Sequence, residues 1–233
     1  MSNSSTLFLS IVGGVIPALI WLLFWLGEDR RRPEPRGLLM FTFFMGMLAV
    51  PLVIPFQKLW VENIPSSSEI TFFVWAILEE VFKYGAAYYA ALRKREMNEP
   101  IDALIYMMTA ALGFAALENT VFIFHPLSDG NITEGLITGN VRFIGASLLH
   151  TISSAAIGVA IALSFYKNSK IKAMELFWGF VAAIGLHTAF NLFIMREHGG
   201  TTFAAFGFVW ISIIVLMLLF EKVKRVYAVN KIE

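Results

Sequence analysis

Seven long apolar stretches constrain this 233-residue chain more than any other feature of its sequence. Each is long enough to cross the roughly 30 Å hydrocarbon core of a bilayer as a helix. Helices suit this setting because every backbone polar group in lipid needs a partner within its own segment. The connections are short and no internal repeat is present, so we expect an all-α polytopic transmembrane bundle of about seven spans, forming a single domain over residues 1–233. The stretches cover residues 7–26, 38–56, 70–92, 101–124, 137–165, 173–195 and 202–220.

Composition narrows the class of partner. Hydrophobic residues make up 58% of the chain and charged residues only 15%, which is typical of a membrane protein embedded in a lipid bilayer. The formal net charge of +1 argues against nucleic acid as a partner, because phosphate binding needs clustered basic residues. The absence of cysteine excludes disulfides, thiol catalysis and thiolate metal sites. Any metal ligands must therefore be His, Glu or Asp.

Basic residues predict the orientation in the membrane. Fourteen basic residues lie in the first, third and fifth connections and the C-terminal tail, which share one side of the membrane. The opposite side has two, Lys58 and Arg196. By the positive-inside rule, the N-terminus lies outside and the C-terminus in the cytoplasm, with the cell membrane as the expected location. The fourteen are Arg30, Arg31, Arg32, Arg36, Arg93, Lys94, Arg95, Lys167, Lys170, Lys172, Lys222, Lys224, Arg225 and Lys231.

Three local features carry expectations of their own. Ser66 and Glu69 form a capping box that opens the third stretch. Pro51 and Pro55 predict a kink or break within the second stretch. Arg142, near the outer end of the fifth stretch, is expected to extend its side chain toward the membrane surface.

Ionisable residues inside the spans are the strongest functional signal. Each costs about 2.5–3.5 kcal/mol to insert at mid-bilayer if it stands alone. A single Glu–Lys pair is adequately explained as a structural ion pair between or along helices. Recurrence on four successive spans instead favours one shared polar site. The residues are Glu79, Glu80 and Lys83 in the third stretch, Glu118 in the fourth, His150 in the fifth, and His187 with Asn191 in the sixth.

These residue types fit metal-assisted hydrolysis. Two histidines and one glutamate form an open ligand set for catalytic zinc, with water in the fourth position. Glu118, His150 and His187 are the predicted ligands of a divalent metal, most simply zinc. A further carboxylate, Glu79 or Glu80, would act as general base toward the water and then as acid toward the leaving amine. No HExxH motif is present, so the ligands must come from separate helices.

Two other polar residues have supporting roles in this hypothesis. Lys83 lies three and four residues after the two glutamates, so it neutralises the spare carboxylate or stabilises a developing oxyanion. Asn191, one helical turn after His187, orients that histidine or donates to the oxyanion.

Four motifs in order resemble the PrsW family of intramembrane proteases. They are EEVFK at residues 79–83, FAALE at 114–118, His150 within LLHTISSA, and HTAFN at 187–191. The resemblance covers a catalytic-like core of about residues 66–195. The last motif ends in Asn191, whereas the PrsW pattern ends in Asp. The related CAAX-prenyl endopeptidase group also ends this motif in Asn. That group has His at the position of Glu118, so Glu118 favours PrsW.

The resemblance implies a metal-dependent endopeptidase. Its expected substrate is a single-span membrane protein, such as an anti-sigma factor, cut near its extracytoplasmic side. Three alternatives stay open: a metal-independent Glu/His peptidase of the CAAX-endopeptidase-like fold, a proton-coupled transporter, and a non-catalytic membrane scaffold.

Overall fold

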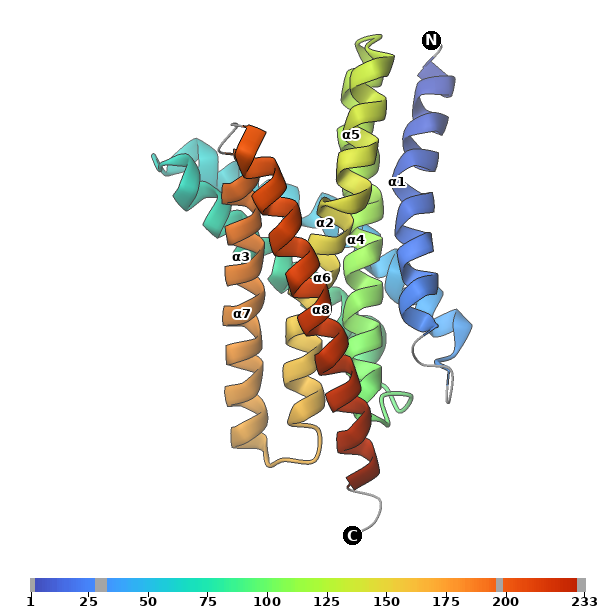
Figure 1. Cartoon of the computed structure of the whole chain (residues 1–233), viewed down its shortest axis with the longest axis vertical. Coiled ribbons are helices and arrows are strands. Elements are labelled where there is room, and N and C mark those ends of the chain that lie inside the picture. The colour runs from blue at the N-terminus through green and yellow to red at the C-terminus, as the bar shows by residue number, and fades with distance from the viewer. Residues whose placement is uncertain (1–2, 28–32, 196–198, 230–233) are drawn as a thin grey trace.

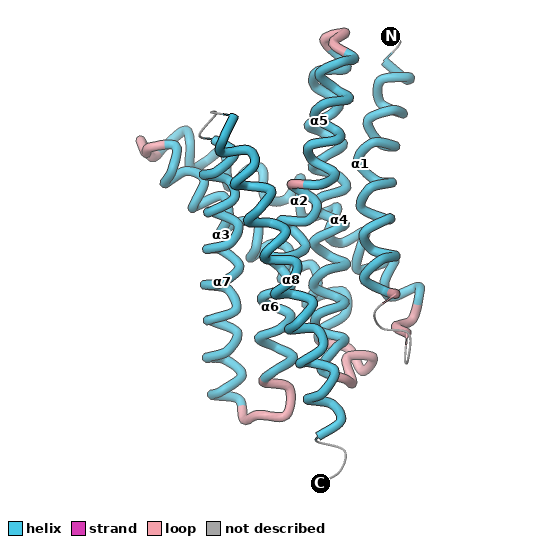
Figure 2. Tube along the Cα trace, viewed as in Figure 1, coloured by secondary structure: helices cyan, strands magenta, loops and turns pink. Residues whose placement is uncertain are grey.

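The computed structural model describes residues 3–27, 33–195 and 199–229, and these segments are helical with short connections and no strand (Figures 1 and 2). The predicted all-α bundle is confirmed. Arg30, Arg31, Arg32, Arg196 and Lys231, which entered the orientation prediction, lie outside the described residues. The helices are α1 (Asn3–Leu26), α2 (Arg36–Asn63), α3 (Ser68–Ala87) with the π-helical turn η1 (Tyr88–Leu92), α4 (Pro100–Ser128), α5 (Ile132–Ile144), α6 (Ala146–Leu163), α7 (Ser169–Met195) and α8 (Gly199–Val229).

Six segments of the described chain are long and apolar enough to cross a membrane: α1, α2, α4, α5 with α6, α7 and α8. The third predicted span, now α3, has sufficient length but carries four charged residues, Glu69, Glu79, Glu80 and Lys83. The start of α1 and the end of α8 lie at opposite ends of the bundle (Figure 1).

Helix α4 is the axis of the bundle. In the 18-residue apolar stretch of α4, 94% of the residues are buried, whereas the share is 22% in the corresponding stretches of α1 and α7. It packs against α1, α2 and α6, which surround it. Small residues on α4 allow this close approach, because they keep neighbouring backbones near one another. They include Ala110, Ala111, Gly113, Ala115 and Ala116, all buried.

The crossing of α2 and α4 depends on two glycines. A Cβ atom added to Gly46 would collide with the backbone of Ala110, and one added to Gly113 would collide with the backbone of Phe43. Backbone cannot move aside as a flexible side chain can, so the crossing has no room for a larger residue. This contact fixes α2 against the helix that carries Glu118.

Replacing Gly113 by Ala should lower the free energy of unfolding by about 1–3 kcal/mol, the usual cost of overpacking. Gly85 is the matched control, since an added Cβ there meets nothing within 4 Å. Thermal unfolding of both variants in detergent measures the difference. Equal melting temperatures for Gly113→Ala and Gly85→Ala would contradict the close crossing.

Helix α2 runs through Pro51 and Pro55 without a break, so of the predicted kink or break only a kink remains. Two other local predictions differ from the structure. The fifth predicted span is two helices, because the chain turns at Gly145 between α5 and α6. At the start of α3 the cap is Ser67, whose hydroxyl accepts from the backbone N–H of Ile70 at 3.5 Å. The predicted cap is one residue from the observed cap, whereas the turn at Gly145 was not predicted.

Candidate active site

The predicted site residues come from four helices and converge on one place in the bundle. Glu79, Glu80 and Lys83 extend from α3, Glu118 from α4, His150 from α6, and His187 with Asn191 from α7. A cavity of about 460 Å³ lies at their meeting point. The members of the set that line it are Glu79, Glu118, His150, His187 and Asn191. Glu80 and Lys83 lie behind this lining and are fully buried.

Glu80 is surrounded by hydrogen-bond donors. Its Oε1 accepts from Lys83 Nζ at 2.7 Å and from Ser153 Oγ at 2.9 Å. Its Oε2 accepts from Ser154 Oγ at 2.7 Å. The Nδ1 of His187 lies 2.9 Å from Oε1. With its oxygens occupied in this way and no exposed surface, Glu80 is suited to orient its neighbours rather than to contact water in the cavity.

The contact with Glu80 sets the tautomer of His187. A carboxylate accepts hydrogen bonds, so the proton of His187 sits on Nδ1. The Nε2 lone pair then points toward Glu79 Oε2, 3.5 Å away. The other oxygen of Glu79 accepts from Gln57 Nε2 at 3.0 Å, but Oε2 is buried and has no hydrogen-bond donor. Two acceptors therefore face each other across a short gap, and Lys83 Nζ, 3.9 Å from Oε2, is too far to donate a hydrogen bond to it. A cation or a further proton between the two acceptors would stabilise this arrangement.

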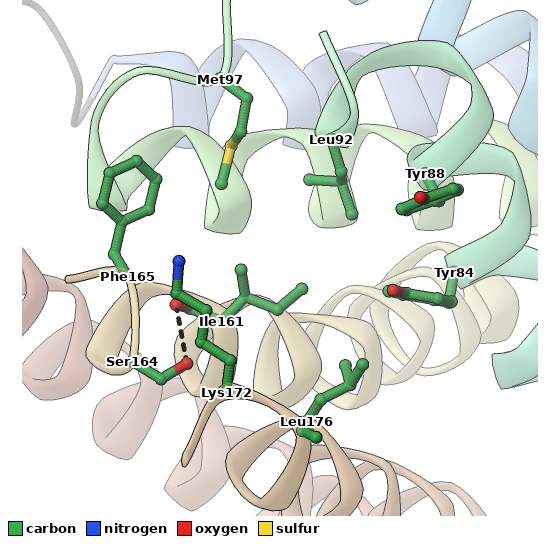
Figure 3. A pocket seen from close by; sticks show the side chains of 10 residues that line it. Tyr84, Tyr88, Leu92, Met97, Ile161, Ser164, Phe165, Lys172 and Leu176 are labelled. Atoms are coloured by element: carbon green, nitrogen blue, oxygen red, sulfur yellow. Dashed lines mark hydrogen bonds between the residues drawn. The ribbon is translucent and has the colours of Figure 1, made fainter. Parts of the chain in front are cut away.

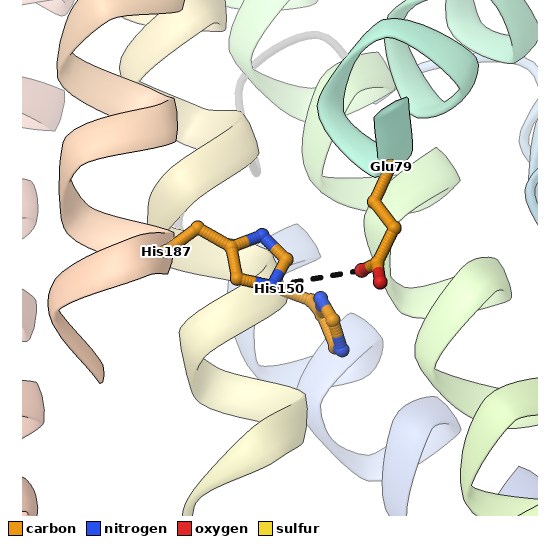
Figure 4. A group of neighbouring side chains, drawn as sticks. All are labelled: Glu79, His150 and His187. Atoms are coloured by element: carbon orange, nitrogen blue, oxygen red, sulfur yellow. Dashed lines mark ion pairs between the residues drawn. The ribbon is translucent and has the colours of Figure 1, made fainter. Parts of the chain in front are cut away.

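The facing pair suits a metal ion. Ligand atoms of Glu79, His150 and His187 lie within 4.8 Å of one another (Figure 4). Two ligands of a tetrahedral zinc ion, each about 2.0–2.2 Å from it, are separated by about 3.5 Å, as Glu79 Oε2 and His187 Nε2 are here. The Nδ1 contact of His187 with Glu80 matches the carboxylate–histidine–metal arrangement that orients zinc ligands. The residues present fit a metal, with Glu79 in the place that the sequence assigned to Glu118.

Lys83 links the two histidine environments. Besides Glu80, its Nζ contacts Nδ1 of His150 at 2.9 Å and lies 4.8 Å from the centre of the Phe114 ring. An ammonium group only donates, so Nδ1 accepts and the ring proton of His150 sits on Nε2. That nitrogen lies 2.9 Å from Oε2 of Glu118, which accepts from it. Lys83 thus neutralises Glu80 and sets the orientation of His150.

Arg142 is a site residue that the sequence interpretation missed. The expectation that it extends toward the membrane surface is wrong, because its guanidinium turns inward and forms an ion pair with Glu118. Its Nε donates to Asn119 Oδ1 at 2.6 Å, and Asn119 Nδ2 donates to Ser147 Oγ at 2.9 Å. Its charge also lies 3.9 Å from the centre of the Phe122 ring. The sequence feature that could have indicated this role is that Arg142 lies near the end of one span and that Glu118, in the preceding span, has no basic residue close to it in the sequence.

Charge balance gives Arg142 its importance. Glu79, Glu80 and Glu118 bring three negative charges to the cluster, and Lys83 and Arg142 bring two positive charges. One negative charge remains with both histidines neutral. A buried uncompensated charge is costly, so the balance also favours a cation near Glu79.

Comparisons with known proteins identify the family of the chain. The family model described as PrsW family intramembrane metalloprotease matches residues 34–219. Protease PrsW of Geobacillus kaustophilus is 28% identical over 200 residues, covering 83% of this chain and 84% of the relative. Protease PrsW of Clostridioides difficile is 27% identical over 79% of this chain and 78% of the relative. Protease PrsW of Bacillus subtilis is 23% identical over 81% and 84%.

No solved structure gives a significant match to the chain. The family match extends over α2 to α7 and into α8, and so includes every helix that contributes to the cavity. The resemblance seen in the four sequence motifs is confirmed. The chain belongs to the PrsW family of intramembrane metalloproteases, and it is an integral membrane protease.

Proposed function

We propose that this protease uses a zinc ion to hydrolyse a peptide bond of a single-span membrane protein, such as an anti-sigma factor, near its extracytoplasmic side. The facing pair of Glu79 Oε2 and His187 Nε2 at the cavity is the observation that carries the proposal. It places an unsatisfied carboxylate oxygen and an imidazole lone pair where a Lewis acid is needed. The family description, intramembrane metalloprotease, supports the same chemistry.

Glu79, His150 and His187 would hold the metal. The set contains nitrogen and oxygen donors only, which suits zinc. When bound, the metal polarises the scissile carbonyl and acidifies a bound water. To serve as a ligand through Nε2, His150 would lose the Nε2 proton through Glu118, 2.9 Å away, to the solvent and would take a proton from Lys83 at Nδ1, so that the ring stays neutral and Glu118 stays ionised.

Glu118 acts as the general base in this proposal, so Glu79 and Glu118 exchange the roles expected from the sequence. Glu118 lines the cavity beside the ligand group and accepts the proton of the water as oxygen attacks the carbonyl carbon. It then returns that proton to the amide nitrogen as the carbon–nitrogen bond breaks. The amide of Asn191, which lines the same cavity, donates to the oxyanion of the tetrahedral intermediate.

Three residues position the reacting groups. Glu80 holds His187 through Nδ1, and Lys83 holds Glu80 and His150. Arg142 holds Glu118 in line with the cavity and is itself fixed by Asn119. Such partners matter because a small displacement of a reacting group costs a large factor in rate.

A metal-independent mechanism is the second candidate, and the same facing pair supports it. A second proton on His187 would place an imidazolium between Glu79 and Glu80 and would satisfy the buried oxygen. Glu79 and Glu118 would then activate water without a Lewis acid. Metal analysis of the purified protein separates the two mechanisms.

The position of the site along the helices supports cleavage in the outer half of the membrane. Glu118 lies closer to the Ser128 end of α4 than to its Pro100 end. In the proposed orientation, with the N-terminus outside the cell membrane, the Ser128 end is the outer end. The cavity would then meet the outer part of a substrate's spanning segment.

The direct test is cleavage in proteoliposomes that contain the protein and a panel of single-span proteins. We expect products whose new termini map to the outer half of the spanning segment or just beyond it. Mass spectrometry of the products gives the position of each cut. Cuts confined to soluble domains or to the inner half of the segment would contradict the proposed site and orientation.

A further inference from the structure

A second, apolar pocket adjoins the catalytic cavity. This side pocket has a volume of about 330 Å³ and lies between α5 and α8. Four residues, Phe122, Arg142, Ala146 and Phe190, line both the side pocket and the catalytic cavity. The two spaces therefore share a wall, and the arginine that holds Glu118 is part of it.

The side pocket faces the surface that lipid covers. In the described residues no Cα atom of α5 lies within 8 Å of a Cα atom of α8, whereas both helices pack against α6. On α5, Ile137 and Val141 line the pocket and are 59% and 41% exposed. Thr138 lies between them on the same helix, and Phe206 lines the pocket from α8. Apolar exposed side chains on a membrane helix face acyl chains or an apolar partner.

We propose that the side pocket is the lateral route by which the apolar spanning segment of a substrate reaches the catalytic cavity, and that it binds an apolar side chain next to the scissile bond. This inference rests on the proposed cleavage of a single-span protein. Its volume admits a leucine- or phenylalanine-sized side chain, and its shared wall places that side chain beside Glu118. Arg142 presents no free charge there, because Glu118 and Asn119 engage it and Phe122 stacks on it.

Another large cavity does not offer such a route. It has a volume of about 400 Å³ and lies among η1, the end of α6 and the start of α7 (Figure 3). Tyr84, Tyr88 and Lys172 contribute polar groups to its lining. It shares no lining residue with the catalytic cavity. Continuity with the catalytic cavity thus distinguishes the side pocket.

Cysteine cross-linking tests the route cleanly, because the chain contains no cysteine. The double variant Thr138→Cys/Phe206→Cys places one thiol on each side of the side pocket, and a bismaleimide spacer would close it. Cleavage of a bilayer-embedded single-span substrate should fall at least tenfold relative to the same variant before linking. A linked protein that cleaves at its unlinked rate would overturn the route and leave the pocket as a lipid-facing groove.

The matched control immobilises α5 on its other side. Leu9 of α1 and Asn140 of α5 both line a separate pocket of about 250 Å³. Linking Leu9→Cys/Asn140→Cys restrains α5 to the same degree without closing the side pocket. This linked form should retain the rate of its own unlinked form. A loss as large as that of the first pair would show that α5 mobility, and not the route, was affected, and would overturn the proposal.

Two further measurements do not depend on the linking reaction, and the second of them does not depend on turnover. Thr138→Trp partly fills the side pocket and should raise KM about tenfold with little change in kcat. A single Thr138→Cys should also form a disulfide with a cysteine in the outer half of the substrate's spanning segment, whereas Asn140→Cys should not. If the protein cleaves nothing, the proposed function fails, but the disulfide yield still tests the route. Equal disulfide yields for Thr138→Cys and Asn140→Cys would contradict the route.

Discussion

Replacing Glu118 by Gln is expected to lower kcat by about 10²–10⁴-fold, the usual loss when a general base is removed. The amide keeps the volume of the side chain but accepts no proton, so the protein should remain inserted and folded. Because Glu79, His150 and His187 remain, the metal content should stay near that of the wild type. Turnover of a verified substrate and elemental analysis of the same preparation measure both. A variant that loses its metal together with its activity would identify Glu118 as a ligand.

Arg142 offers an independent check on this assignment. If it acts by holding Glu118, Arg142→Gln should lower kcat, and adding it to Glu118→Gln should lower kcat no further. Arg142→Lys keeps the charge but not the donor to Asn119, so it should recover part of the activity. Arg93→Gln is the matched control, since that arginine stacks on Tyr89 away from the cavity. Fully additive losses in the double variant would contradict a role through Glu118.

Stability separates positioning from simple helix packing. Arg142→Gln leaves Glu118 as an unpaired, largely buried charge, which destabilises by about 3–5 kcal/mol in soluble proteins. The double variant removes both charges and should recover most of that loss. Thermal unfolding in detergent gives this comparison without any substrate.

Glu79→Gln is expected to abolish both metal binding and turnover. The substitution removes the buried oxygen that faces His187 Nε2 and replaces a carboxylate ligand by a weak amide ligand. The expected loss of metal affinity exceeds the 10–100-fold typical of residues that only orient a ligand. Titration of the purified variant with zinc measures the affinity, and turnover of the same substrate measures the activity.

Glu80→Gln is the natural comparison for Glu79→Gln. Glu80 contacts His187, Lys83 and two serines and does not line the cavity, so its replacement should weaken zinc binding by only about 10–100-fold. Comparing zinc binding by the Glu79→Gln and Glu80→Gln variants therefore distinguishes a metal ligand from a residue that orients a ligand. A Glu80→Gln variant with weaker zinc binding than Glu79→Gln would reverse these assignments.

The spans and the convergence of the site follow from the physics of the bilayer, which is why the sequence predicts them. Glu79, Glu118, His150 and His187 are costly in lipid when alone, so four neighbouring helices carrying them were expected to meet. The structure brings these side chains to one cavity. The spacing of three residues between Glu80 and Lys83 also sufficed to expect their contact, since it repeats near one helical turn.

The separate roles of Glu79, Glu80 and Arg142 can be assigned only from the three-dimensional structure. Neighbouring helix positions point about 100° apart, and the sequence does not give the rotation of α3, so it could not tell that Glu79 lines the cavity while Glu80 lies behind it. Arg142 could not be assigned because its inward turn depends on the break at Gly145 and on Asn119 from another helix. Tertiary contacts decided both cases.

The most direct test of the central claim is turnover by the wild-type protein in proteoliposomes before and after its metal is removed by a chelator. Cleavage of a verified single-span substrate should fall at least 100-fold in the metal-free protein and return with about one zinc ion per chain, the stoichiometry of a single Glu–His–His site. Elemental analysis confirms removal and reloading. Undiminished cleavage by protein shown to be metal-free would contradict the account and would favour the imidazolium form of His187 between Glu79 and Glu80.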